Sequence, residues 1–470
     1  MDVGIRQSET KGVSMKVIGI IAEYNPFHQG HAYQIKKLKE TCHGDYVVIA
    51  MSGNFVQRGA PALMEKYSRT KMALSCGADL VLELPTLFAT SSAEYFARGG
   101  VCLLHSTGII THLGFGAETD DLDLLTELSA ILSNPPSSYE NILHKKLKEG
   151  LTFPKARANA LESCVFSSVL EKSGSFSNTE KNTKNTNVPH LACTAKELAE
   201  ILASPNNILA LEYLKALKAI HSHIIPVPIQ RIGKSYHAAE MEADFCSAYA
   251  IRAFLEKRED FNSVEHTNWN SDNAVKPNRF LLPETTMPAV SYNILQDYPH
   301  PFLYEDDFSP LLHYELLTKD IGSLSAWADS SPDLARRLVR ERIHFTNWRE
   351  FCRHMKTKNI TYSRLSRLFL HILLHIRQKE YESFPSPAYL RILGFRKSAQ
   401  PLLTALKSNS TLPVITRLAD ASNQLPVQAQ HLLELDLRAT DLYRLALTAK
   451  GDSTLKNDYQ QQVIRFSPHD

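Results

Sequence analysis

The segment from Val17 to Ala22, read as VIGIIA, places the strongest constraint on the fold of this chain of 470 residues. It is apolar at nearly every position, and such a run is typical of a strand that is buried on both faces of a parallel sheet. Asn25-Pro26 ends the predicted strand, and a lysine-rich helix is predicted from Ala32 to Glu40. The chain therefore opens with a strand, a tight turn and a helix.

The turn in this unit reads His28-Gln29-Gly30-His31. A helix that starts directly after a strand and a tight turn presents backbone N–H groups and a positive helix end to an anion. Gly30 has no side chain, so a phosphate can approach the backbone there. The two histidines are three residues apart and can donate ring N–H groups to phosphate oxygens. The turn predicts a phosphate site, and two incidental histidines in a turn are the alternative.

Strands and helices continue to alternate along the next 100 residues. We predict strands at 46–51, 80–84 and 109–113 and helices at 65–76 and 91–104. This alternation predicts an α/β fold with a Rossmann-like parallel sheet and right-handed crossovers. Ligands bind beyond the carboxyl ends of the strands in such sheets. We therefore expect the loops at 23–31, 52–61 and 114–118 to line one pocket.

The second half of the chain has a different character. Residues 259–315 are predicted to be loops, and the chain beyond about 316 is predicted to be almost entirely helical. Segment 331–380 contains twelve Arg and Lys residues against four Asp and Glu, a net charge of +8 in a chain whose total is only +2. Concentrated positive charge predicts a nucleic-acid contact, although most charge runs are solvated helix faces.

Four side chains of this basic segment are the candidate RNA contacts. Arg364 and Arg367 are three residues apart and share a helix face, and Lys356 and Lys358 precede them. Trp348 and Tyr362 are candidates for stacking on exposed bases.

Several classes of protein are disfavoured by composition. No apolar run approaches the roughly 18 residues of a membrane span. Residues 1–14 lack the apolar core of a signal peptide, so they are predicted to be a disordered tail, with Met15 as the true start of translation as the alternative. Seven cysteines occur without CxxC spacing, which suggests no zinc site and favours a reducing, cytoplasmic compartment. Residues 173–187, rich in Ser, Asn, Thr and Lys, are predicted to be a flexible insertion.

A resemblance to a known family rests on these motifs. The HxGH pattern of His28, Gly30 and His31 after an apolar strand resembles the signature of the HIGH-type nucleotidyltransferase superfamily. The longer phrase EYNPFHQGH, at 23–31, resembles the bacterial tRNA(Met) cytidine acetate ligase family. Further similar phrases are SGNFVQRGAP at 52–61, GADLVLELP at 77–85, SPNNILALEY at 204–213, QRIG at 230–233 and YLRILGFRKSAQPLL at 389–403. The resemblance covers about residues 15–455.

The resemblance implies a set of site residues. His28 and His31 are the implied catalytic residues. The implied ATP-binding residues are Ile21, Ala22, Glu23, Tyr24, Asn25, Pro26, Phe27, His28, Gln29, Gly30, His31, Ala32, Tyr33, Gln34, Gly116, Asn206 and Arg231. Asn206 is preferred over Asn207, and helix capping is the alternative role for both.

Three further residues are candidate phosphate contacts. Ser247 and Arg252 belong to SAYAIR, which is similar to a degenerate form of the superfamily's second signature, Ser-Ser-Thr-x-x-Arg. Ala248 and Tyr249 replace the second Ser and the Thr, which weakens any prediction of hydroxyl contacts there. Arg58 is the third candidate, and a solvated loop arginine is an equal alternative.

The resemblance also implies an activity and an architecture. The enzyme would be a ligase that uses ATP with Mg²⁺ and acetate to acetylate the wobble cytidine of elongator tRNA(Met) in the cytoplasm. We expect no protein-bound transition metal, no membrane association and no obligate protein partner. The expected domains are a nucleotidyltransferase-like α/β domain at 15–280 and a mostly α-helical domain at 281–470. The alternatives are a nucleotidyltransferase that moves AMP to a small phosphate-containing acceptor, and an RNA-binding protein with a relict nucleotide pocket.

Overall fold

The computed structural model describes residues 15–151, 156–163, 195–231, 247–265, 282–283 and 286–467. The tail predicted at 1–14 and the insertion predicted at 173–187 lie outside the described residues.

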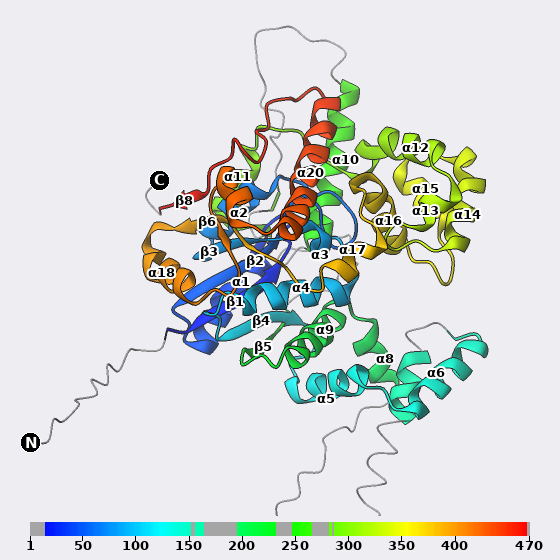
Figure 1. Cartoon of the computed structure of the whole chain (residues 1–470), viewed down its shortest axis with the longest axis horizontal. Helices are drawn as coiled ribbons and strands as arrows, with labels where there is room; N and C mark the ends of the chain where they lie inside the picture. The colour runs from blue at the N-terminus through cyan, green and yellow to red at the C-terminus, as the bar shows by residue number, and fades with distance from the viewer. Residues whose placement is uncertain are drawn as a thin grey trace, which may run out of the picture.

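A single mixed sheet forms the centre of the molecule, and its strand order is β5-β4-β1-β2-β3-β6-β7, with β8 also paired to β6 (Figure 1). The first five strands are mutually parallel, whereas β6 is antiparallel to β3. The strands are β1 (Val17–Ala22), β2 (Tyr46–Ser52), β3 (Leu80–Leu84), β4 (His112–Ala117), β5 (Ile225–Gln230), β6 (Leu390–Arg396), β7 (Val414–Ile415) and β8 (Ile464–Phe466).

Alternate residues of the central strands enter two separate hydrophobic cores. In β2, Val47, Ile49 and Met51 belong to one core, whereas Val48 and Ala50 belong to the other. All five side chains are fully buried. This is the arrangement that a run of uninterrupted apolar residues predicts, because a strand with both faces covered has no solvent face that needs polar side chains.

Helices cover both faces of the sheet. Those of the first half are α1 (Gln29–Cys42), α2 (Lys66–Ser75), α3 (Thr86–Ala89), α4 (Ala93–His105), α5 (Leu122–Ser133), α6 (Ser137–Lys148), α8 (Ala195–Ala203), α9 (Pro205–Ala219) and α10 (Ala248–Glu265). Those of the second half are α11 (Ala289–Gln296), α12 (Ser309–Thr318), α13 (Ile321–Ser325), α14 (Pro332–Glu341), α15 (Trp348–Met355), α16 (Tyr362–Leu374), α17 (Gln378–Ser383), α18 (Gln400–Asn409), α19 (Ala421–Gln424) and α20 (Val427–Ala449).

The fourth strand differs from the prediction. We expected a strand at 109–113 and a loop at 114–118, but β4 runs from His112 to Ala117. Its glycines suggested a loop, yet one of them, Gly114, is required by packing in the strand. A Cβ on Gly114 would lie 2.2 Å from Cδ1 of Leu38 on α1, so only glycine lets this helix approach the strand.

Two other local predictions were incomplete. Segment 259–315 was predicted to be loops, but it contains the end of α10, all of α11 and the start of α12. Two of its prolines stand at helix starts, where a missing N–H costs nothing: Pro288 is the N-cap of α11, and Pro310 lies in the first turn of α12.

The helical C-terminal part was predicted correctly as a class, but its strands β6 to β8 were not predicted. They extend the N-terminal sheet, because β6 pairs with β3.

A buried charge cluster ties this C-terminal extension to the sheet. Nζ of Lys66 lies 2.7 Å from Oε1 of Glu83 and 2.9 Å from Oδ2 of Asp458, and Nη1 of Arg391 lies 2.9 Å from Oε2 of Glu83. All four side chains are almost completely buried. Burial and Arg391 act to lower the pKa of Lys66, but Asp458 and Glu83 outweigh them and raise it. Two cations and two anions therefore neutralise one another inside the protein.

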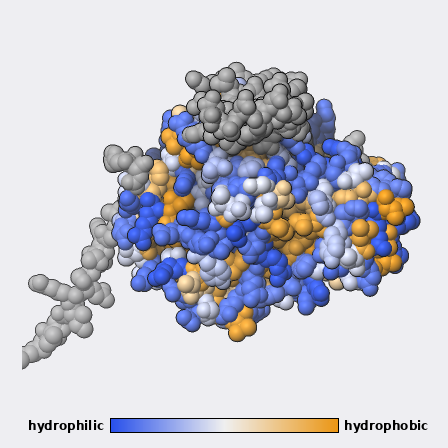
Figure 2. Space-filling view, turned by 90° about the horizontal axis from the view of Figure 1, so that it is seen from above, coloured by the Kyte–Doolittle hydropathy of each residue, from blue (hydrophilic) through white to orange (hydrophobic). Residues whose placement is uncertain are grey.

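The helices from α12 to α16 form a lobe beside the sheet (Figure 1). Large apolar side chains are exposed on it, among them Tyr314, Leu317 and Ile343, and hydrophobic surface is visible on this lobe in Figure 2. Among the described residues, no helix is long and apolar enough to cross a membrane.

Candidate nucleotide-binding and catalytic site

The strand order itself locates the candidate site. From β1 the chain proceeds to β2 and β3 on one side, and then crosses to β4 on the other side of β1. In parallel α/β sheets, ligands bind at such a switch point, outside the carboxyl ends of the strands. The loop that follows β1 carries the HxGH motif, so the motif lies at this position.

His28 and His31 form a capping box at the start of α1. Nδ1 of His28 accepts a hydrogen bond from N–H of Gly30 at 3.1 Å, and Nδ1 of His31 accepts one from N–H of His28 at 3.2 Å. The two rings are stacked, with 3.7 Å between their centroids. Because each Nδ1 uses its lone pair as an acceptor, the neutral rings carry their protons on Nε2. Both rings can therefore donate N–H to a phosphate.

Both histidines are neutral at physiological pH. Burial, with smaller effects from Arg231 and Arg252, lowers the pKa of His28 to about 3. Burial, His28 and Arg231 lower the pKa of His31 well below its ordinary value. His31 retains some solvent exposure, but the rings of Tyr24, Phe27 and His28 enclose it. The site thus offers neutral donors rather than imidazolium charges.

Gly30 leaves the space that the His28 ring needs in order to cap α1. A Cβ at this position would lie 2.9 Å from Cε1 of His28 and 3.1 Å from its Nδ1. Any other residue would push the His28 ring off the backbone N–H that it accepts. The absence of a side chain was predicted to admit a phosphate, and the structure adds this requirement.

The loop before the motif contains a cis peptide bond and is held by two polar contacts. The Asn25–Pro26 peptide bond is cis, Oδ1 of Asn25 accepts from N–H of Leu63 at 2.7 Å, and Nη1 of Arg252 donates to the Asn25 carbonyl at 2.5 Å. Arg252 therefore reaches the loop before the motif from α10, and its role as a phosphate contact stays a prediction. Ser247 caps the same helix, because its Oγ accepts from N–H of Ala250 at 3.2 Å.

One positioning residue was missed by sequence reasoning. Arg69 on α2 is fully buried and donates to the carbonyls of Glu23 at 2.5 Å and Ser52 at 3.1 Å, and also to that of Gly53. It thereby joins the ends of β1 and β2. A lone arginine in a helix carries no sequence signal for carbonyl partners in two other loops, so the pattern could not reveal it.

The opposite wall comes from β4, β5 and the start of α9. The nearest side-chain atoms to a Cβ built on Gly116 would be Cγ of Arg231 at 3.4 Å and Nε2 of Gln34 at 4.0 Å. Nη1 of Arg231 donates to Oδ1 of Asn206 at 3.3 Å. Gly116, Gln34, Arg231 and Asn206, predicted from distant parts of the chain, are therefore neighbours.

The two asparagines at the start of α9 have different roles. Asn207 is buried, and its Oδ1 accepts from the backbone of Glu118 at 2.9 Å, so it is structural. Asn206 is partly exposed and joins Oε1 of Glu118 at 2.7 Å to Arg231. Asn206 is therefore the more accessible of the two asparagines, and its contact with the nucleotide stays a prediction.

The remaining candidate ATP contacts are contiguous with the motif. Ile21, Ala22 and Glu23 stand at the carboxyl end of β1, and the partly exposed Ala32, Tyr33 and Gln34 lie in the first turns of α1. Arg58 is partly exposed beside Gly59, whose Cα packs so closely on α16 that a Cβ would lie 2.4 Å from N of Arg367.

The candidate RNA contacts are only partly accessible. Arg367 is buried and pairs with both carboxylate oxygens of Asp329 at 2.9 Å, and Nε of Arg364 donates to the Asp329 carbonyl at 3.0 Å. The interpretation of Arg367 as an exposed contact is therefore wrong, because its side chain is consumed by an internal ion pair.

The aromatic and lysine candidates also differ in their exposure to solvent. Trp348 is buried, and its Nε1 donates to Ser366 Oγ at 3.1 Å, so it cannot stack on a base. Tyr362 is half-buried. Lys356 and Lys358 are exposed, and Lys358 donates to the Gly150 carbonyl at 2.6 Å. Among the described residues, no group of three or more His, Cys, Asp and Glu side chains could hold a metal ion.

Comparisons with known proteins agree with this geometry. Residues 15–458 match the family model described as HIGH Nucleotidyl Transferase, so the chain belongs to that family of nucleotidyltransferases.

Within it, the relatives are more specific. The chain is 36% identical over 452 residues to the tRNA(Met) cytidine acetate ligase of Thermoanaerobacter sp. strain X514, a match that covers 96% of this chain and 100% of the relative. It is 33% identical over 456 residues to the protein of the same name from Acetivibrio thermocellus, with the same two coverages. The chain therefore belongs to the tRNA(Met) cytidine acetate ligase family.

Solved structures support the same grouping. The crystal structure of Thermotoga maritima TmcAL bound with alpha-thio ATP has a TM-score of 0.77 and 29% sequence identity, and covers 96% of this chain and 99% of that one. The apo structure of the same protein has a TM-score of 0.80. The neighbour binds an ATP analogue, which agrees with a nucleotide site on this fold.

Proposed function

We propose that this protein activates acetate with ATP and transfers the acetyl group to N4 of the wobble cytidine of elongator tRNA(Met). The observation that carries the activation step is the stacked, neutral His28–His31 pair at the start of α1, placed at the switch point between β1 and β4. The full-length similarity to tRNA(Met) cytidine acetate ligases supports the choice of acid and acceptor.

In the first step, an acetate oxygen attacks the α-phosphorus of ATP, and the bond from that phosphorus to the bridging oxygen of the β-phosphate breaks. The products are acetyl-adenylate and pyrophosphate. The reaction needs positioning and stabilisation of phosphate charge more than covalent help from the protein. Nε2–H of His28 and of His31 and the N-terminus of α1 would supply fixed donors, and Arg231 would supply a positive charge.

In the second step, the cytosine N4 amine attacks the acetyl carbonyl. The bond between that carbonyl and the phosphate oxygen of AMP breaks, AMP leaves, and the amine loses one proton to solvent. The described residues around His28 include no nucleophilic Ser or Cys paired with a base, and direct transfer requires none.

ATP is expected to enter as its Mg²⁺ complex. Mg²⁺ characteristically keeps several waters and binds the phosphates of its nucleotide with few protein ligands. The carboxylate of Glu118 is linked to Arg231 through Asn206, but its oxygens already accept from Asn206 and from N–H of Asn207 at 3.0 Å. We therefore assign no protein ligand to this ion. The site of action would be the cytoplasm, where tRNA is modified.

Two measurements on the purified protein test the proposal. Pyrophosphate exchange into ATP should require acetate, and mass spectrometry should find N4-acetylcytidine in elongator tRNA(Met) only when ATP, acetate and protein are all present. Exchange that proceeds without acetate, or with a small phosphate-containing acceptor in its place, would favour simple AMP transfer instead.

A further inference from the structure

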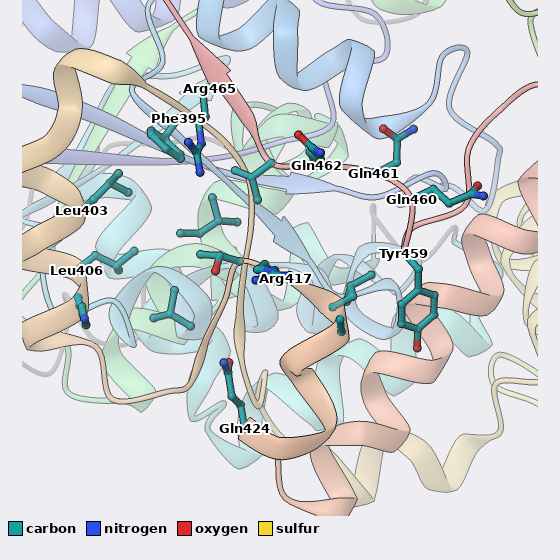
Figure 3. Close-up of a pocket in the computed structure, with 17 residues that line it drawn as sticks. Phe395, Leu403, Leu406, Arg417, Gln424, Tyr459, Gln460, Gln461, Gln462 and Arg465 are labelled. Atoms are coloured by element: carbon teal, nitrogen blue, oxygen red, sulfur yellow. The ribbon is translucent and has the colours of Figure 1, made fainter.

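The structure contains a large cavity that lies apart from the histidine site, and we call it the edge cavity. Its volume is about 1200 Å³, and it is bounded by β6, β8, α18 and the segments 414–419 and 459–463. Figure 3 shows Arg465 and Phe395 together at one end, Tyr459 at the other end, and Gln460 to Gln462 between them.

The cavity arises from a split in the outer edge of the sheet. β7 pairs with Leu390 and Arg391 of β6, whereas β8 pairs with Gly394 to Arg396. Neither short strand is in register with Ile392 or Leu393. The chain leaves the sheet after β7 through segment 414–419 and returns to it before β8 through segment 459–463. These two segments enclose the space between the strands.

The side chains that line the edge cavity suit an anion with a planar group. Lys407, Arg417 and Arg465 are present, and no Asp or Glu lines the cavity. Lys407 and Arg465 form no hydrogen bond or ion pair with any described residue. Arg417 is 77% exposed and lies 3.8 Å from Asp420, too far for strong pairing. Positive side chains without internal partners are free to bind phosphate.

The cavity also offers stacking and base-edge groups. Tyr459 is 65% exposed, and its ring contacts no other aromatic ring among the described residues. Three glutamine amides, from Gln424, Gln461 and Gln462, can each donate and accept hydrogen bonds, and Gln460 can donate, since its Oε1 already accepts from N–H of Asn457 at 3.1 Å. An exposed aromatic ring beside basic side chains is the arrangement that binds unpaired nucleotides, because every base has a face on which a ring can stack.

The edge cavity and the histidine site lie toward opposite ends of the sheet. Arg465 pairs with Phe395, which pairs with Leu80 at the start of β3, whereas His28 follows the carboxyl end of β1. β6 also lies three strands from β1, which is about 15 Å at about 4.8 Å per strand. An RNA that contacts both sites must therefore span more than about five stacked nucleotides at about 3.4 Å each.

We propose that the edge cavity is a second RNA-contacting site, which holds an unpaired base on Tyr459 and adjacent phosphates on Arg465 and Lys407. The proposal rests on the proposed function, because the RNA is then the tRNA whose cytidine reaches the histidine site. It assigns part of the tRNA affinity to the sheet edge rather than to the basic segment 331–380.

The test uses full-length protein and transcribed elongator tRNA(Met). Tyr459→Ala should raise the Kd for tRNA roughly tenfold, because it removes the ring on which a base would stack, whereas Tyr459→Phe should bind like the wild type. Replacing Arg465 and Lys407 with Ala should reduce the salt dependence of binding by about two phosphate contacts. Acetate-dependent pyrophosphate exchange should be unchanged in all of these variants.

Matched controls are available on other surfaces. Tyr314→Ala removes a tyrosine that is also 65% exposed, and Arg98→Ala removes an exposed arginine on α4. Neither should alter tRNA binding.

Two results would overturn the proposal: wild-type tRNA affinity and salt dependence in all edge-cavity variants, or binding of free AMP or CMP at Tyr459 without an effect on tRNA. If wild-type protein shows no acetate-dependent exchange, the proposed function fails, while the comparison of tRNA binding still decides the role of the edge cavity.

Discussion

The turn after β1 and the helix α16 were both expected to bind phosphate. In the structure, the donors of the turn remain available to a ligand, whereas the arginine donors of α16 have partners inside the protein. In the turn, His28 and His31 satisfy the backbone through Nδ1, and this leaves the proton on Nε2 of each ring. In α16, Arg367 directs its guanidinium to Asp329 inside the protein. A count of donors in a segment therefore predicts binding poorly, because what matters is whether the donors already have partners.

The pKa values express the same contrast. Burial lowers the pKa of His28 to about 3, so the site gains donors without charge. Burial alone would raise the pKa of Asp329, but the hydrogen bond and charge of Arg367 outweigh it and hold that pKa below its ordinary value. The histidine donors of the turn are therefore available to bind a ligand, whereas Arg367 and Asp329 in the α16 pair already satisfy each other.

The largest effect is expected in the turn. His31→Ala should reduce acetate-dependent pyrophosphate exchange by about 10²–10³-fold, as the loss of a fixed donor to phosphate charge does. His31→Gln keeps an acceptor at the capping-box position and should retain stability while activity still falls. Lys36→Ala, on an exposed position of the same helix, is the control. A folded His31→Ala protein with near-normal exchange would end this assignment.

The matching change in α16 should act on stability instead. Arg367→Ala should lower the free energy of unfolding by about 3 kcal/mol, because it leaves a largely buried carboxylate without its partner. Urea denaturation measures this effect, and Asp329→Asn in the same background should recover part of the loss. Lys356→Ala should change stability little, since that side chain is exposed. Weaker tRNA binding by folded Arg367→Ala, with unchanged stability, would restore the original interpretation.

A smaller effect is expected at Arg231. It is exposed, and it has only the 3.3 Å hydrogen bond to Asn206 in the described part of the chain, so its charge is available to a triphosphate. Arg231→Ala should raise KM for ATP roughly tenfold, the size of one lost charge-assisted hydrogen bond. The thermal midpoint should not move. Asn207→Ala should instead lower the thermal midpoint and leave KM for ATP nearly unchanged. If both variants raise KM and lower the thermal midpoint equally, the two residues do not have the distinct roles described above.

The smallest effect concerns pH. The pKa of His28 in the folded protein lies below its unfolded value near 6.5. Between these two pKa values, His28 is protonated in the unfolded chain but not in the folded protein. The stability that this contributes is present above about pH 6.5 and is lost as pH falls toward about 3. The free energy of unfolding should therefore fall less steeply between pH 6 and 4 in His28→Gln than in the wild type. Identical slopes would show that His28 protonates freely in the folded state.

Much of the N-terminal fold could be predicted from local patterns. Strands β1, β2 and β3 lie where apolar runs placed them, and the alternation of strands and helices correctly indicated a Rossmann-like sheet. The neighbouring positions of Gly116, Asn206 and Arg231 followed from the resemblance, and the structure brings them together. The division into domains near residue 280, and the roles assigned to individual site residues, stay predictions.

What the sequence determined by itself is local: a strand too apolar for a solvent face, a turn whose glycine and histidines cap a helix, and the alternation that makes a parallel sheet. The tertiary structure decided which charged side chains form ion pairs inside the protein. Lys66 meets Asp458 across 392 residues, and Arg367 meets Asp329 across 38. Such pairs depend on where distant segments return, and no local periodicity encodes that. The antiparallel β6 and the split edge beside it were hidden for the same reason, because each needs a partner strand from elsewhere in the chain.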